Sequence, residues 1–326
     1  MEAADEITVL RDGENVGTVV ADETTREELA ELMVGREVIL DVEKRPATVG
    51  ESTLGVEGCV AEDERGVRAV DDVSFEVREG EVFGIAGVDG NGQSELVEAI
   101  TGLRDPTAGR ISFEGTDITD HSRRERIDRG MAYIPEDRQE RGLVMDFDLV
   151  GNGMLGSQHR EPFAKGGRLD WSTARGHTES VIDEYDVRPP NPDSTAESLS
   201  GGNQQKFIVG REFERDPTLV VAAHPTRGVD VGSIEFIHER LLDLRDQGVA
   251  VLLISSKLEE VQGLSDRLAV MHDGRFMDTV DPEGVTEEEI GLLMGGEYPD
   301  DWDEEATEAD AGTDADAGVR ADGDGR

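Results

Sequence analysis

The sequence has little cysteine and little lysine. Cys59 is the single cysteine, so an intramolecular disulfide is excluded, and we expect a small buried side chain in a reducing cytoplasm. Lysine occurs only at Lys44, Lys165, Lys206 and Lys257. The sequence also lacks a run of 18 apolar residues, and its first residues carry no basic or apolar leader. Neither a transmembrane helix nor a secretory signal is therefore expected.

Positive charge is scarce overall, with 32 basic residues against 75 acidic residues and a net charge of −43. A surface of this sign repels nucleic acid and anionic lipid headgroups at ordinary salt, so no nucleic-acid partner is expected. Concentrated counterions make such self-repulsion tolerable when they shorten the Debye length to roughly 3 Å. The composition resembles that of proteins from salt-in halophilic archaea, and we interpret it as adaptation to salt rather than as ligand chemistry.

Two segments near the ends of the sequence repeat each other without a gap. Residues 5–35 align with residues 266–296, and the paired glycines Gly13 and Gly274 give the offset, 274 − 13 = 261. Each copy predicts a strand, an Asp-Gly turn, a second strand and a short helix opened by threonine. Because an offset of 261 residues is about the size of one domain, residues 1–45 are expected to be the tail of a preceding domain that is missing from this chain.

The remaining residues divide into a linker, a domain and a tail. Residues 46–53 are a predicted linker, residues 54–296 form the main domain, and residues 297–326 form an acidic tail that is predicted to be disordered. Buried strands are expected at 82–86, 219–223 and 249–254, and helices at 93–101, 203–214 and 233–245. This alternation indicates an α/β domain with a parallel sheet. Residues 137–192, without a strong strand signal, predict a mostly helical insertion.

Residues 87–94, GVDGNGQS, follow the first buried strand and precede a helix. This is the context of a P-loop, where backbone N–H groups and a helix N-terminus surround phosphate oxygens. Ser94 stands where a hydroxyl would bind Mg²⁺, whereas Gln93 replaces the lysine expected beside it. A tight strand-to-helix turn without a ligand is the alternative, because a glycine-rich loop alone is a weak signal.

Residues 199–206, LSGGNQQK, lead directly into the second predicted helix. The run matches the signature sequence of ABC ATPases, which is a specific pattern. Ser200, Gly201 and Gly202 offer a hydroxyl and N–H donors at a helix start, suited to the γ-phosphate of a nucleotide held by another domain. The alternative is an ordinary helix cap by Ser200.

With both motifs in place, residues 54–296 resemble an ABC ATPase throughout. Residues 134–138, IPEDR, occupy the Q-loop with Glu136 in place of glutamine, and residues 225–230, PTRGVD, end in the D-loop residue Asp230. The combination is most similar to the C-terminal half of two-domain ATPases of nucleoside and simple-sugar importers. The resemblance implies a P-loop NTPase fold with a RecA-like parallel-sheet core, an antiparallel β subdomain and a helical subdomain. It also implies ATP and Mg²⁺ as cofactors.

The resemblance assigns residues to two separate roles. Those expected at this chain's own nucleotide are Gly87, Asp89, Gly90, Asn91, Gly92, Gln93, Ser94 and Glu136, with Ser94 on the metal. Those offered in trans to a partner's nucleotide are Ser200, Gly201, Gly202 and Gln204, with Asp230 meeting the partner domain.

The catalytic positions implied by the resemblance are not intact. The strand that would end in aspartate and glutamate ends in Ala223 and His224, and Ser256 replaces the switch histidine. Ala223 cannot hold the Mg²⁺ shell, and His224 lacks partners in ligand spacing, so a structural role is expected for it. Losing one preorganised electrostatic group costs about 10²–10³ in rate, and grouped losses do not add. We expect negligible hydrolysis at this site and leave the chain's own ABC-type ATPase activity open.

The implied assembly is an asymmetric pair. A first ABC nucleotide-binding domain, on a separate chain or in the missing half, would supply an intact ATP site that this chain completes. Integral-membrane permease subunits and, indirectly, an extracellular solute-binding protein would be the other partners, with this chain peripheral on the cytoplasmic face of the cell membrane. The alternatives are a non-catalytic regulatory or decayed half-ABC interaction protein and a soluble ABC ATPase of DNA repair or translation, which the acidic charge disfavours.

Overall fold

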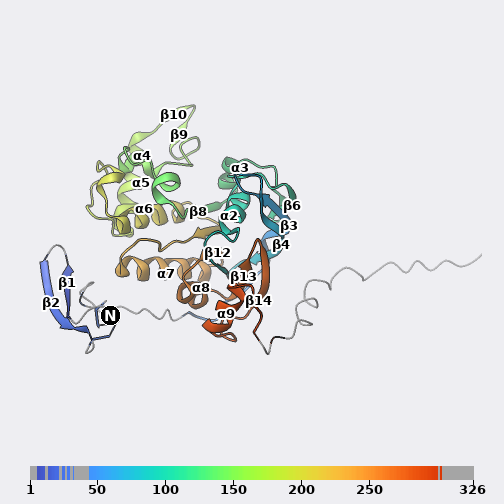
Figure 1. Ribbon diagram of the computed structural model, residues 1–326. Helices are drawn as coiled ribbons and strands as arrows, with labels where there is room; N and C mark the ends of the chain where they lie inside the picture. Colours follow the sequence, from blue (N-terminus) through green and yellow to red (C-terminus); the bar gives the residue numbers. More distant parts are fainter. Residues whose placement is uncertain are drawn as a thin grey trace, which may run out of the picture.

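A six-stranded sheet forms the centre of the molecule (Figure 1). The computed structural model describes residues 6–11, 14–21, 24–25, 28–29, 32, 44–299 and 302. In spatial order the central strands are β14 (Arg275–Val280), β13 (Arg267–His272), β5 (Val82–Gly87), β12 (Ala250–Ser255), β11 (Leu219–Ala223) and β8 (Met131–Ile134). All neighbours are parallel except β14, which is antiparallel to β13.

The central strands are continuous apolar runs because both faces of the sheet are covered. Every residue of β5, β11, β12 and β8 is buried. The helices are α2 (Gln93–Thr101), α3 (Arg123–Asp128), α4 (Leu149–Gly153), α5 (Trp171–Glu184), α6 (Gly201–Phe213), α7 (Val231–Asp246), α8 (Leu258–Leu264) and α9 (Glu287–Met294). The predicted strands and helices of the core are confirmed, with shifts of one to two residues at some ends.

A second, four-stranded antiparallel sheet packs against one side of the core. Its strands are β4 (Arg68–Arg78), β3 (Ser52–Glu62), β6 (Ala108–Phe113) and β7 (Thr116–Asp117), in that order. Helix α2 contacts both this sheet and β11, so one hydrophobic cluster joins the two sheets. Cys59 is fully buried in that cluster, as the sequence predicts. Strand β3 begins at Ser52, inside the predicted linker.

Helices α4, α5 and α6 form a separate group, at the upper left of Figure 1 and away from β3, β4 and β6. The insertion at 137–192 is less regular than the predicted mostly helical segment. Besides α4 and α5 it holds one π-helical turn, Arg138–Gly142, and a small hairpin of β9 (Ala164–Lys165) and β10 (Arg168–Leu169). The predicted parallel core, antiparallel β subdomain and helical subdomain are all present.

Where both copies are described, the two repeated segments have the same local structure; the Asp-Gly turn at 12–13 and most of the predicted helix of the first copy lie outside the described residues. Strand β1 (Glu6–Arg11) pairs with β2 (Glu14–Val20), and the register breaks between Val9 and Leu10. The β13–β14 hairpin breaks at the matching place, between Val270 and Met271. Both copies then use a threonine and a glutamate in a reciprocal cap: Thr25 with Glu28, and Thr286 with Glu289. The repeat is thus a repeat of structure.

The start of the predicted acidic tail is attached to the domain. Indole Nε1 of Trp302 donates to a carboxylate oxygen of Asp278 at 2.7 Å, and the Tyr298 hydroxyl donates to the carbonyl of Met277 at 3.0 Å. Ordered contacts therefore extend beyond Gly296. Residues 303–326 lie outside the described residues.

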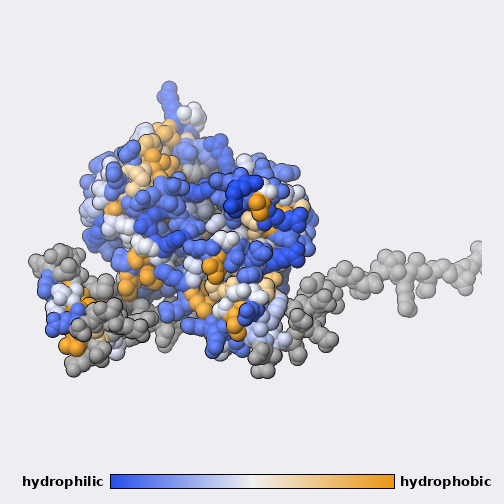
Figure 2. Space-filling view, in the orientation of Figure 1, coloured by the Kyte–Doolittle hydropathy of each residue, from blue (hydrophilic) through white to orange (hydrophobic). Residues whose placement is uncertain are grey.

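The surface is mainly hydrophilic, as the acidic composition leads one to expect, with separate hydrophobic patches (Figure 2). Exposed large apolar side chains in the helical region include Val144, Phe147, Leu169 and Trp171. Among the described residues, no helix combines the length and apolar character needed to cross a bilayer.

Candidate functional site

The loop between β5 and α2 has the geometry of an anion-binding turn. Gly90 and Gly92 have φ of 94° and 99°, the left-handed region that glycine enters without strain, and Gly92 caps α2. A Cβ on Gly92 would collide with the carbonyl oxygen of Ala69. The loop therefore needs glycine here for both its backbone conformation and its close approach to the antiparallel sheet.

The loop is also fixed to the turn of the β13–β14 hairpin. The amide of Gly274 donates to the carbonyl of Asn91 at 3.0 Å, and the amide of Asp273 donates to Asn91 Oδ1 at 3.1 Å. The Asp-Gly turn of the repeat thus supports the P-loop. The sequence assigns Asn91 to the nucleotide, but in the structure its side-chain oxygen accepts this hydrogen bond within the domain.

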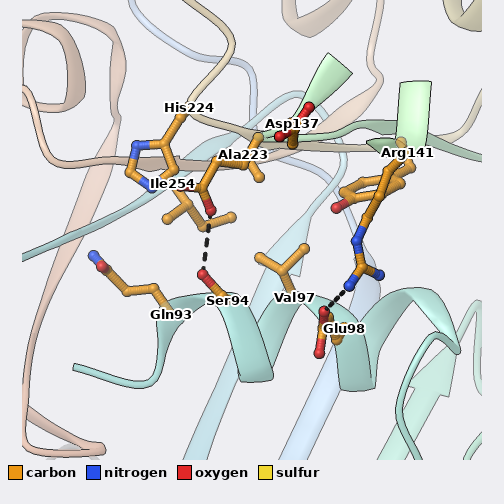
Figure 3. A pocket seen from close by; sticks show the side chains of 11 residues that line it. Gln93, Ser94, Val97, Glu98, Asp137, Arg141, Ala223, His224 and Ile254 are labelled. Atoms are coloured by element: carbon orange, nitrogen blue, oxygen red, sulfur yellow. Dashed lines mark hydrogen bonds and ion pairs between the residues drawn. The ribbon is translucent and has the colours of Figure 1, made fainter. Parts of the chain in front are cut away.

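A cavity of about 130 Å³ opens beside the start of α2. Figure 3 shows Gln93 and Ser94 on α2 with Ala223, His224 and Ile254 across from them. Its lining residues are Gln93, Ser94, Val97, Glu98, Tyr133, Glu136, Asp137, Arg141, Ala223, His224 and Ile254. The structure thus brings together the predicted P-loop, the Q-loop and the end of β11.

Gln93 is 3% exposed, and its amide Nε2 has no hydrogen-bond partner among the described residues. Leaving a buried donor unpaired costs about 1–3 kcal/mol. Gln93 therefore fills the lysine position with a neutral group whose donor is left over. The hydroxyl of Ser94 donates to Glu136 Oε2 at 3.2 Å, so the residue predicted to bind Mg²⁺ faces the Q-loop carboxylate.

The end of β11 carries no acid. Ala223 is 4% exposed and His224 is 7% exposed, with His224 in the left-handed region at φ 46°. The amide of Ser256 donates to His224 Nδ1 at 3.3 Å, and the His224 amide donates to the carbonyl of Ile254 at 2.8 Å. Burial lowers the pKa of His224. The imidazole is thus an acceptor that connects the ends of β11 and β12, which is a structural role.

The residues present fit the phosphate groups of a nucleotide better than they fit its metal. Gly92 has no side chain to cap α2, so the N–H groups of the first helical turn have no acceptor at the cap, which suits a phosphate. For Mg²⁺ the described chain offers the Ser94 hydroxyl and the Glu136 carboxylate, and no group of three acidic, histidine or cysteine side chains could hold a metal ion there. Glu136 is moreover paired with the guanidinium of Arg227.

The signature loop forms the capped start of α6. Helix α6 begins at Gly201, two residues before the predicted start, because Ser200 acts as its cap. The Ser200 hydroxyl oxygen accepts from Asn203 Nδ2 at 2.8 Å, and Ser200 itself is exposed. Gly201 and Gly202 occupy the first helical positions, where N–H groups have no helical acceptor. Ser200 therefore caps α6 while its side chain stays exposed.

Gln204 lies inside the signature loop. It is 3% exposed, and its Nε2 donates to the carbonyls of Ala196 at 3.0 Å and Leu199 at 3.3 Å. A side chain held this way supports the loop from inside and offers no group to another domain. The role of Gln204 toward a partner's nucleotide stays a prediction.

The D-loop lies against the signature loop. Asp230 caps α7 by accepting from the amide of Ser233 at 3.0 Å and from its hydroxyl at 2.9 Å. A Cβ on Gly202 would collide with the Asp230 carboxylate and would come within 2.6 Å of the Ser233 hydroxyl. Asp230 is exposed, so the two loops present one continuous surface.

A buried carboxylate that the sequence does not single out lies beneath these loops. Glu260 accepts from the hydroxyls of Thr226 and Ser255 at 2.6 and 2.5 Å and contacts His238 Nε2 at 2.9 Å. Burial alone would raise its pKa, but these hydrogen bonds lower the pKa of Glu260 overall. The network joins the segment after β11 to the end of β12 and to α7.

Comparison with known proteins agrees with the geometry. Residues 70–227 match the family model for the ABC transporter. The chain is 48% identical over 292 residues to the guanosine import ATP-binding protein NupO of Bacillus subtilis, covering 90% of this chain and 57% of the relative. It is 46% identical to the glucose import ATP-binding protein TsgD13 of Haloferax volcanii, covering 90% and 54%. The chain thus spans about half the length of the curated relatives it matches.

Solved structures match the fold. The crystal structure of a nucleotide-free ATP-binding cassette from an ABC transporter gives a TM-score of 0.62 at 25% identity, over 75% of this chain and 96% of the cassette. A dimeric cassette bound to ADP and Pi also gives 0.62, at 20% identity, over 71% of this chain and all of that cassette. The predicted fold class, a P-loop ABC ATPase, is confirmed.

Proposed function

We propose that this chain, which carries an ABC transporter ATP-binding domain of the nucleoside and sugar importer type, completes the ATP site of a partner cassette. The observation that carries the proposal is the contrast between two ends of the same domain. The end of β11 presents Ala223 and His224 to the P-loop, whereas the signature and D-loop surface is intact, capped and exposed around Ser200.

The chain's own site serves to hold nucleotide rather than to hydrolyse it. The loop of residues 87–94 surrounds the phosphates, with Ser94 and Glu136 as the groups nearest a Mg²⁺ ion. When bound, Mg²⁺ would neutralise phosphate charge, and this chain's residues would orient the phosphates through backbone N–H groups. A carboxylate to polarise an attacking water is missing at His224, so turnover at this site is negligible.

The partner is a first ABC nucleotide-binding domain with an intact lysine, aspartate and glutamate. Three observations support a two-cassette assembly: the length of the relatives, the dimeric cassette of the same fold, and the repeated hairpin. We propose that residues 1–45 are the tail of that first domain, because β1–β2 has the register, the bulge and the cap of β13–β14. The pair would drive permease subunits, fed by an extracellular solute-binding protein, from the cytoplasmic face of the membrane.

The proposal predicts where ATP hydrolysis appears. The purified chain should turn over ATP at no more than about 1% of the rate of the assembled pair, since removing single catalytic groups costs about 10²–10³. Adding the partner cassette, with its permease subunits, should restore hydrolysis that depends on the partner's Walker lysine. Hydrolysis by the isolated chain at the rate of the pair would refute the assignment. A pair that stays inactive would favour a non-catalytic interaction protein instead.

A further inference from the structure

Two arginines connect the Q-loop with the D-loop in opposite directions. Arg138 follows Glu136 in the Q-loop and sends its guanidinium to the D-loop backbone. Arg227 lies in the D-loop and sends its guanidinium back to the Q-loop carboxylate Glu136 and to Asp89 of the P-loop, the latter at 3.4 Å. The two contacts are reciprocal, so a displacement of either loop strains both.

Arg138 makes three directed hydrogen bonds on two different elements. Its Nη1 donates to the carbonyl of Arg227 at 2.8 Å and its Nη2 to that of Gly228 at 3.4 Å. Its Nε donates to Gln204 Oε1 at 3.2 Å, inside the signature helix. The planar guanidinium suits this task because its donors point in fixed directions, whereas a lysine ammonium is a single point charge.

The backbone at Gly201 lies close to the same side chain. A Cβ on Gly201 would come within 2.7 Å of Arg138 Nη2 and 3.2 Å of the carbonyl of Gly228. The signature loop, the D-loop and Arg138 are thus in mutual contact. Gly202 meets Asp230 on the adjoining side, so the surface offered to a partner is packed from within.

Arg227 reaches the cavity through its ion pair with Glu136, and among the described residues no unpaired arginine lines that cavity. Gln93 stands at the P-loop cation position, and Arg141, the arginine among the described residues that lines the cavity, is paired with Glu98 at 2.7 Å. Ala223 provides no acid through which a metal ion could join the P-loop to the segment after β11. Arg227 makes this connection with its own charge.

We propose that Arg138 and Arg227 act as positioning residues that hold the signature loop and the D-loop in place without a nucleotide in this chain's own site. The inference rests on the proposed function and deepens it, since the surface held in place is the one offered to the partner. Arg138 contributes more than Arg227, because Arg227 is half exposed and exposed ion pairs contribute little. The partner's nucleotide then meets a preformed surface, which avoids an ordering cost at each closure.

Hydrogen–deuterium exchange on the isolated chain tests the positioning directly. The reporters are the amides of Gln204, Arg227 and Ser233, which bond to Ser200, His224 and Asp230 within the two loops. Exchange at these amides should change less than about twofold when ATP and Mg²⁺ are added. Arg138→Gln and Arg138→Lys should both speed it about tenfold, and Arg227→Gln about threefold. Arg110→Gln, which breaks an exposed ion pair with Asp117, is the matched control and should change nothing there.

Three outcomes would overturn the inference: strong added protection of the wild-type loops by ATP, full protection retained in Arg138→Lys, or unchanged exchange in Arg138→Gln. Exchange at the buried amides of β11 shows whether a variant still folds. A double substitution, Arg138→Gln with Gln204→Ala, should reduce the protection of the reporter amides by less than the sum of the two single substitutions. The reason is that the two side chains share a hydrogen bond.

The assembled pair gives the functional readout. Arg138→Gln should lower kcat for ATP about tenfold and leave KM within about twofold, because the partner's own P-loop binds the nucleotide first. A wild-type pair without activity would defeat the proposed function, while the exchange experiment would still decide the positioning role. An active pair in which Arg138→Gln retains full kcat would defeat the positioning role alone.

Discussion

The part of this domain around the P-loop and the part around the signature loop differ in their contacts although they lie on adjacent strands and helices. On the first, Gln93 leaves a buried donor unpaired and β11 ends without an acid. On the second, Ser200 and Asp230 each cap a helix, a Cβ on Gly201 would come within 2.7 Å of Arg138 Nη2, and a Cβ on Gly202 would collide with the Asp230 carboxylate. Under the proposed function, the substitutions at Gln93, Ala223 and His224 affect one role of the fold, while the packing around Gly202 maintains the other.

The largest loss of ATP hydrolysis is expected from a substitution in the signature loop. Gly202→Ala would drive a Cβ into Asp230 and Ser233 and displace the loops from each other. ATP hydrolysis by the assembled pair should fall about 100-fold, comparable to removing one preorganised donor. Gly176→Ala on α5 is the control, since a Cβ there meets nothing within 4 Å. Equal losses in the two variants would show that the effect is not local.

The buried carboxylate beneath both parts should have an intermediate effect. Glu260→Gln should lower the free energy of unfolding by about 1–3 kcal/mol at pH 7, since an ionised acceptor is lost from three hydrogen bonds. The native pKa of Glu260 lies below its usual value of 4.5. The stabilisation is therefore complete above that value and is lost as pH falls through the native pKa.

Urea unfolding of both proteins between pH 7 and pH 3 measures this difference. The gap in the free energy of unfolding between the wild type and Glu260→Gln should narrow on the acid side. A gap that stays constant with pH would mean that Glu260 is not ionised in the folded protein.

The smallest change in ATP hydrolysis is expected from a substitution in the P-loop. Gln93→Ala removes an amide whose donor has no partner among the described residues, so hydrolysis by the assembled pair should change less than about twofold. Steady-state ATPase assays of the pair, beside Gly202→Ala, measure the contrast. A loss at Gln93 as large as that at Gly202 would reverse the comparison between the two parts.

Much of the fold could be predicted because local chemistry determines it. The predicted bounds of α2, 93–101, are the observed ones, since Gly92 and Gly102 end the helix in left-handed conformations. Helix α6 begins two residues before the predicted 203, because Ser200 caps it and two glycines of low helix propensity occupy its first positions. The short elements of the insertion at 137–192 could not be predicted, since they depend on packing and not on a periodic sequence pattern.

The motifs of the site could be predicted from the sequence, but the hydrogen bonds and ion pairs between its loops could not. The spacing of glycine and polar residues is enough to identify the motifs at 87–94 and 199–206. Arg138 and Arg227 also lie in recognisable segments, but their partners are distant in the sequence. The contact of Arg138 with Arg227 spans 89 positions, and that of Arg227 with Glu136 spans 91. Nothing local specifies such pairs, nor that Gln204 points inward. Glu260 carries no motif at all, and only its burial among hydroxyls reveals it.

The position of β5 has a consequence for how the protein is made. This strand, which ends in the P-loop, lies between β12 and β13, and the amide of Val82 donates to Asp266, 184 residues later. At about 5–20 residues per second of synthesis, the strand waits roughly ten seconds or more for both neighbours. During that time a fully apolar strand has open edges, so a chain truncated before β12 should aggregate rather than fold.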